Sequence, residues 1–225
     1  FYMAQNPTPL KVHRGAGALN YIAKLGYAMT WLTALVMRRD LYFGIKENIM
    51  YYLITDTHIG HANIIRLCHR PDNFEELVFS AWMARGQQED TVIHLGDVAW
   101  DEKSLKRFAG LPGRRILIKG NHDSLPDSAY MEAGFMPVCS EMLINFDGMR
   151  VLFSHRPKFG HTEDINIHGH QHDLHREDLT RLYLPLALEH MGYRPIAMNH
   201  DFLSRLHSWV DRAHIPTIEE IIALR

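Results

Sequence analysis

Short runs of β-branched, leucine and aromatic residues recur along the middle of the chain, and most of them end at polar side chains. Such runs are typical of buried β-strands, and the segments between them have the apolar spacing of helices. The alternation predicts right-handed crossovers in a layered α/β domain. The predicted strands cover residues 51–55, 91–95 and 115–119, and the predicted helices cover 64–67, capped by Asn63, 75–85 and 104–108.

The second half of the chain is richer in strand signals. Residues 142–146 and 150–153 flank Asp147-Gly148, a dipeptide that is typical of β-hairpin turns. The remaining expected elements are a strand at residues 164–167, a strand or a helix at 181–188, a helix at 201–212, and a short helix opened by a capping box of Thr217 and Glu220.

Residues 1–49 differ in composition from residues 50–225, so we expect an N-terminal extension followed by the main domain. The apolar stretch at residues 25–37 has 13 uncharged residues, fewer than the ~20 that a membrane-spanning helix needs. We expect a helix that packs on the domain or on a second copy of the chain, which would make the protein a homo-oligomer. The alternatives are a membrane or targeting role, and a natural start at Met50.

Composition narrows the class of protein. The chain has 225 residues, 46% of them hydrophobic, and a formal net charge of -2, so it can bury one core and carries no overall basic field. Its two cysteines have neither a disulfide framework nor a zinc-binding spacing, which favours a cytoplasmic location without a membrane. The unusual count is 16 histidines, because histidine is the commonest metal ligand.

Oxygen and imidazole donors, without thiolates, gather at the ends of the apolar runs. This mixed set suits Mn, Fe, Zn or a comparable divalent ion better than a structural cysteine-type zinc site. Seven ligands are too many for one tetrahedral ion and suit two ions, about 3.5–4 Å apart, that share a carboxylate. The candidate metal ligands are Asp56, His58, Asp97, Asn121, His155, His170 and His172.

The order of these motifs resembles that of the calcineurin-like metallophosphoesterase superfamily. The resemblance covers residues 51–172 and is carried by Asp56-x-His58, Gly96-Asp97, Gly120-Asn121-His122-Asp123, His155 and Gly169-His170-x-His172. The small, single-domain bacterial and phage-type phosphoesterases are similar in a further motif, Gly60-His61-x-Asn63-Ile64-Ile65. The resemblance implies a four-layer α/β/β/α sandwich in the α/β class, with the site at the strand ends.

The resemblance also implies how the ligands divide between two divalent ions. Manganese is the expected metal, and Fe, Zn, Ni and Mg are alternatives. Two such cations lower the pKa of a bridging water enough to supply hydroxide near neutral pH. One ion would be held by Asp56, His58, Asp97 and His172, and the other by Asp97, Asn121, His155 and His170, with Asp97 bridging.

The residues beside these ligands have expected roles of their own. His122 follows a ligand and is free to donate a proton to the leaving oxygen, and Asp123 could orient its imidazole. The alternative for Asp123 is a turn or cap residue. His61 and Arg156 are candidate contacts for the substrate phosphate.

These observations predict a metal-dependent phosphoesterase that hydrolyses a phosphodiester or, alternatively, a phosphomonoester. No inserted cap domain fits between Asn121 and His170, so we expect an open site for a small phosphate ester, a nucleotide or a nucleic acid. A catalytically silent scaffold of the same fold is an alternative. A protein phosphatase is disfavoured, because Gly96-Asp97 is followed by Val98-Ala99-Trp100-Asp101 and Asp123 stands where those enzymes have glutamate.

Overall fold

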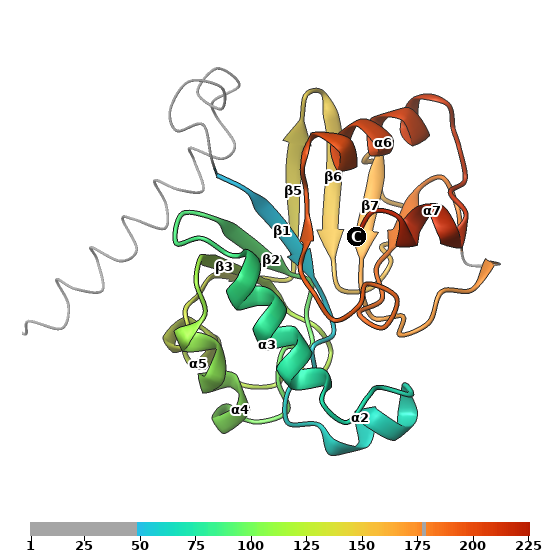
Figure 1. Cartoon of the computed structure of the whole chain (residues 1–225). Helices are drawn as coiled ribbons and strands as arrows, with labels where there is room; N and C mark the ends of the chain where they lie inside the picture. Colours follow the sequence, from blue (N-terminus) through green and yellow to red (C-terminus); the bar gives the residue numbers. More distant parts are fainter. Residues whose placement is uncertain (1–48, 177–178) are drawn as a thin grey trace, which may run out of the picture. The chain divides into compact units, whose positions relative to one another are not determined.

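The computed structural model describes residues 49–176 and 179–225, which form two β-sheets and the helices that flank them (Figure 1). The predicted N-terminal helix and its oligomer contacts lie outside these residues. The first sheet has the order β4-β3-β2-β1-β9 and the second β5-β6-β7-β8. Their strands are β1 (Tyr51–Ile54), β2 (Thr91–His94), β3 (Arg114–Ile118), β4 (Phe135–Cys139), β5 (Glu141–Phe146), β6 (Met149–Ser154), β7 (Ile165–His168), β8 (Tyr183–Pro185) and β9 (Ile196–Ala197).

Strands β1 to β4 run parallel, and β9 pairs antiparallel with β1. In the register of the first three, Ile54 lies opposite His94, and His94 lies opposite Leu117. The segments that follow these strands therefore leave the same edge of the sheet.

The second sheet begins with the predicted hairpin. β5 and β6 pair antiparallel up to Phe146 and Met149, and both turn residues have positive φ, 50° at Asp147 and 97° at Gly148. Two positive φ values are what a two-residue hairpin turn of type I′ requires. β7 and β8 then add in parallel, with Ser154 of β6 opposite His168 of β7.

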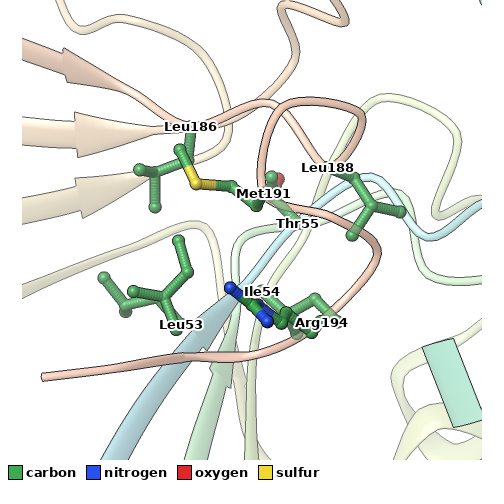
Figure 2. Close-up of a pocket in the computed structure, with 8 residues that line it drawn as sticks. Leu53, Ile54, Thr55, Leu186, Leu188, Met191 and Arg194 are labelled. Carbon is green, nitrogen blue, oxygen red and sulfur yellow. The ribbon is translucent and has the colours of Figure 1, made fainter. Parts of the chain in front are cut away.

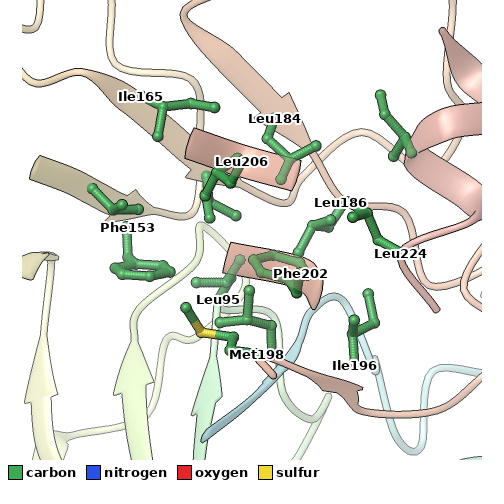
Figure 3. Close-up of a cluster of buried hydrophobic side chains, with 14 of the residues drawn as sticks. Leu95, Phe153, Ile165, Leu184, Leu186, Ile196, Met198, Phe202, Leu206 and Leu224 are labelled. Carbon is green, nitrogen blue, oxygen red and sulfur yellow. The ribbon is translucent and has the colours of Figure 1, made fainter. Parts of the chain in front are cut away.

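Alternating side chains divide the core into two clusters. Leu53 belongs to the cluster that joins the two sheets, whereas its neighbour Ile54 belongs to the cluster under the helices that cover the first sheet. Figure 3 shows side chains from both sheets and from α6 in the first cluster. The helices are α2 (Ala62–Leu67), α3 (Phe74–Arg85), α4 (Glu102–Lys106), the 3-10 helix η1 (Arg107–Gly110), α5 (Asp127–Glu132), α6 (His200–Asp211) and α7 (Ile218–Ile222).

The predicted α/β class with two packed sheets between helices is confirmed. The capping box at Thr217 is confirmed as well. The helix expected from Asn63 instead has His61 at its N-cap, without a side-chain cap bond, so the prediction of the cap was wrong. Helix α5 and strands β4 and β9 were not predicted. β4 contains Pro137, which a strand tolerates here because β4 lies at the edge of its sheet and its register with β3 shifts beside the proline.

Candidate metal centre

The loops that follow β1 and β2 run on side by side beyond the strands. Asp56 N donates to Gly96 O at 3.0 Å, and His58 N donates to Asp97 O at 2.9 Å. Asp56, His58 and Asp97 all have left-handed backbones, with φ of 50°, 46° and 56°. Such conformations are costly for non-glycine residues and occur where the surroundings enforce them, often at functional sites.

Asp56, His58 and His172 form the first candidate metal cluster. Asp56 Oδ2 accepts hydrogen bonds from Thr55 Oγ1 at 2.5 Å and from His170 N at 2.8 Å. Asp56 Oδ1 and His58 Nε2 are both buried, lie 3.9 Å apart, and have no hydrogen-bond partner among the described residues. A carboxylate oxygen and an imidazole nitrogen left in this way fit a divalent cation.

Asp97, His155 and His170 form the second candidate metal cluster. His155 Nδ1 donates to the Leu95 carbonyl at 2.8 Å. In the neutral imidazole, Nε2 therefore carries a lone pair that can bind a metal. That nitrogen faces Asn121 Oδ1 at 3.0 Å and Asp97 Oδ2 at 3.4 Å. Three acceptor atoms that face one another fit a cation between them.

Asp97 lies between the two clusters. Its Oδ2 atom is 3.5 Å from His58 Nε2 and 3.4 Å from His155 Nε2. Its Oδ1 atom accepts the backbone N–H of His122 at 2.8 Å. This geometry is compatible with the bridging role that the resemblance implies, since one carboxylate oxygen reaches toward both groups.

Burial and charge shift the pKa values of these ligands in opposite directions. Burial raises the pKa of Asp56 to about 6 and lowers the pKa of His58 far below its usual range. For Asp97, burial acts against ionisation, but a protonated His155, the His122 N–H and the charge of His58 together lower the pKa. Of these two carboxylates, Asp97 therefore ionises more readily, whereas Asp56 binds a proton up to about pH 6 unless a cation stabilises its charge.

Two residues that sequence reasoning did not place, Arg70 and Glu189, support the first cluster. Glu189 Oε1 lies 3.1 Å from His172 Nδ1, an arrangement that leaves Nε2 for a metal. Arg70 is buried, pairs with Glu189 at 2.7 Å, and donates to the carbonyl of Asp56 at 2.8 Å. Cys68 lies near His172 and Glu189, but the guanidinium already supplies a positive charge to that group.

Arg70 belongs to none of the sequence motifs that carry the candidate ligands. Its partner Glu189 is 17 residues beyond His172 in the chain, with no motif between them. A buried arginine needs an acidic partner, and this need is the signal that could have revealed the pair. The sequence does not show which arginines are buried.

The structure gives Asp123 a different contact from the one expected. Its Oδ2 accepts the N–H groups of Asp97 at 2.7 Å and Gly120 at 2.8 Å, and its Oδ1 accepts the N–H of Val98 at 2.9 Å. No described hydrogen bond joins it to the His122 imidazole. The alternative of a turn residue fits better: Asp123 fixes the loops after β2 and β3 rather than the His122 ring.

His122, His61 and Arg156 lie at the rim. The ring of His122 is exposed, with its centroid 5.4 Å from that of His58. The ring of His61 lies 5.8 Å from His58, and burial lowers its pKa. Arg156 is exposed and donates through Nε to Asn121 Oδ1 at 3.3 Å.

Gly169 and Gly120 allow the backbone to approach the carboxylates closely. A Cβ at Gly169 would lie 2.5 Å from Asp56 Oδ2, and one at Gly120 would lie 2.1 Å from Asp97 Oδ1. Neither position has room for a side chain while the carboxylates stay in place, which explains glycine before a ligand in both motifs.

A small pocket lined mainly by apolar side chains lies beside Thr55 (Figure 2). It is lined by Leu53, Thr55, Leu186 and Met191, among others, and its volume of about 10 Å³ suits at most one water molecule. Thr55 is its link to the site, through the bond to Asp56. The pocket contains none of the candidate ligands and is too small for a substrate.

Comparison with known proteins agrees with this geometry. The family model for calcineurin-like phosphoesterases matches residues 50–219. The chain belongs to the calcineurin-like phosphoesterase family. Members of this family are phosphoester hydrolases that use divalent metals, and the two clusters supply donors for them.

The chain is similar in sequence or structure to several other proteins. The chain is 28% identical over 164 residues to the uncharacterized protein MJ1445 of Methanocaldococcus jannaschii, which covers 66% of this chain and 86% of that protein. It is 30% identical over 156 residues to the Gene 66 protein of Mycobacterium phage D29, covering 54% and 77%. The crystal structure of AQ665 from Aquifex aeolicus, a protein of unknown function, superimposes with a TM-score of 0.60 at 30% identity and covers 71% of this chain and 100% of its own.

Proposed function

We propose that this calcineurin-like phosphoesterase hydrolyses phosphodiesters with two divalent metal ions, manganese being the expected metal. The observation that carries the proposal is the position of Asp97 Oδ2, 3.5 Å and 3.4 Å from imidazole nitrogens of the two clusters. When bound, such ions would acidify water to supply a nucleophile and would neutralise charge on the phosphoryl oxygens.

The ligands divide between the ions as the two clusters do. Asp56, His58 and His172 would hold one ion, with Glu189 fixing His172 through Nδ1. His155, His170 and Asn121 would hold the other, and Asp97 would serve both. Every donor atom in this division is an oxygen or a nitrogen, a set that also accepts Fe, Zn, Ni or Mg.

His122 is the group that would move a proton. Its backbone is tied to Asp97, while its imidazole is exposed beside the ring of His58. From this position it would donate a proton to the leaving oxygen or stabilise the charge that develops there. Arg156, bonded to Asn121, would bind a phosphoryl oxygen, and His61 would line the same rim.

The preference for diesters rests on the open rim. His122 and Arg156 are exposed. The described segment between Asn121 and His155 contains no inserted domain that could cover the site. An open rim leaves space for an ester group on each side of the phosphate, so cyclic nucleotides, simple diesters and nucleic-acid ends belong to the proposed range.

Two further points are part of the proposal. Among the described residues, no helix is both long and apolar enough to cross a membrane. Cys68 and Cys139 are free thiols, which favours a reducing compartment such as the cytoplasm.

The proposal is tested by hydrolysis of bis(p-nitrophenyl) phosphate and p-nitrophenyl phosphate, before and after loading with Mn, Mg, Zn or Ni. A metal-dependent rate that is higher on the diester is expected. A higher rate on the monoester would overturn the diester preference. Inactivity of the loaded protein on both, together with 2′,3′- and 3′,5′-cyclic nucleotides and single-stranded RNA, would favour the silent scaffold.

A further inference from the structure

An exposed tryptophan lies beside the metal centre. The residues before it are buried, with Val98 at 0% and Ala99 at 5% exposure, whereas Trp100 is 51% exposed. The exposed indole leaves a large, flat apolar surface in water beside a group of polar candidate ligands.

The Trp100 ring continues the group of rings at the rim. Its centroid lies 3.9 Å from that of His61 and 5.8 Å from that of His122. Each of these imidazoles in turn lies within 6 Å of the ring of His58, at 5.8 Å and 5.4 Å. One imidazole therefore separates the indole from a candidate metal ligand.

The backbone fixes Trp100 in this place. Its N–H donates to the carbonyl of Ile59 at 2.8 Å, and Ile59 forms a parallel β-bridge with Ala99. Ile59 is completely buried. The indole thus stands on the same paired loops that carry Asp56, His58 and Asp97, so its distance from the metal centre is set by rigid backbone.

We propose that Trp100 stacks on the aromatic base of a nucleotide substrate whose phosphate lies at the metal centre. This inference rests on the proposed phosphoesterase function and narrows its substrate to nucleoside phosphoesters. A flat π face next to polar imidazoles suits a base, which is itself flat and polar at its edge, and stacking on an aromatic side chain tolerates any of the four bases. In a nucleotide, a ribose separates the base from the phosphate. In the protein, the width of one imidazole separates the indole from the nearest candidate ligand.

The test compares two ligands that differ only in the base. AMP and ribose 5-phosphate are titrated into the Mn-loaded wild type and into the Trp100→Ala and Trp100→Phe variants, and binding is followed by calorimetry. We expect the wild type to bind AMP roughly 10-fold more tightly than ribose 5-phosphate. Trp100→Ala should remove this difference by weakening AMP alone, and Trp100→Phe should retain most of it.

Phe159→Ala is the matched control. Phe159 is 84% exposed, and its ring lies against Tyr183 of β8. It does not belong to the group of rings formed by Trp100, His61 and His122. Its removal should leave both affinities unchanged. Circular dichroism and the metal content of each variant check that the fold and the metal centre are intact.

Two results would overturn the inference, and they can be told apart. If the loaded wild type hydrolyses bis(p-nitrophenyl) phosphate but Trp100→Ala weakens AMP and ribose 5-phosphate equally or not at all, Trp100 does not stack on the base. If the loaded wild type hydrolyses no phosphoester, the proposed function fails, and the inference fails with it.

Discussion

The two candidate metal clusters differ in how firmly the protein holds them. In the first, Asp56 and His58 are almost fully buried, Arg70 donates to the backbone carbonyl of Asp56, and Glu189 contacts the ring of His172. In the second, Asp97 and His155 are buried, but Asn121 is exposed and its amide oxygen contacts the exposed Arg156. If each cluster binds an ion as proposed, we expect the first to hold its ion more tightly, and the second to present its ion to the substrate and to exchange it more readily.

The largest effect is expected where the clusters meet. Asp97→Ala removes the oxygen that lies between His58 and His155, so both clusters should lose affinity. We expect turnover to fall on the order of 1000-fold or more, because metal activation of water and charge stabilisation are lost together. Metal content by mass spectrometry and rates on bis(p-nitrophenyl) phosphate measure this, with the exposed His175→Ala as a control. Retention of two tightly bound ions would show that Asp97 does not bridge.

His122→Ala should separate catalysis from metal binding. The side chain contributes no bond to either cluster, so the metal content should stay at the wild-type value. Turnover should fall roughly 100-fold, the usual contribution of a positioned proton donor. A rate equal to wild type would assign proton transfer to solvent or to the other rim histidine, His61.

Glu189→Gln tests whether the clusters respond independently. The amide keeps the volume but weakens the hold on His172 and leaves Arg70 without its ion-pair partner. The first cluster should lose roughly 10-fold to 100-fold in metal affinity, and the second should change little. Stepwise calorimetric titration with Mn resolves the two. An equal loss in both clusters would mean that they bind as one unit.

The smallest effect concerns His94, which ties the loops of the two clusters together. Its Nε2 bonds Thr57 Oγ1 at 2.9 Å, its Nδ1 accepts from Gly96 N at 3.2 Å, and burial lowers its pKa to about 3. Because the unfolded chain binds this proton more readily, the folded state loses stability as the pH falls below the unfolded pKa of about 6.5.

The loss at His94 should reach about 2 kcal/mol at pH 5 relative to pH 7. Urea unfolding of the apoprotein at several pH values measures it. His94→Gln, which cannot be protonated, should reduce the slope of stability against pH in this range. A slope that the substitution leaves unchanged would assign the acid sensitivity to other groups.

Side-chain type and local pattern were enough to predict the main strands and the candidate ligands. A buried parallel strand needs an apolar run, and a metal site needs oxygen and imidazole donors at the strand ends, so both leave a signal in adjacent residues. β4 was missed because Pro137 is unfavourable in most strands, so its segment does not have a typical strand pattern. β9 was missed because two residues are too few to show a periodic pattern.

The sequence by itself determined the family, the α/β class and the candidate ligands in their chain order, because these depend on residue identity and short spacing. The tertiary structure alone decided three matters. It placed Asp97 Oδ2 between the two clusters, turned Asp123 toward backbone N–H groups rather than His122, and brought Arg70 and Glu189 behind His172. Each depends on which distant segments meet and which atoms lose water there, and that is set by the packing of the whole chain.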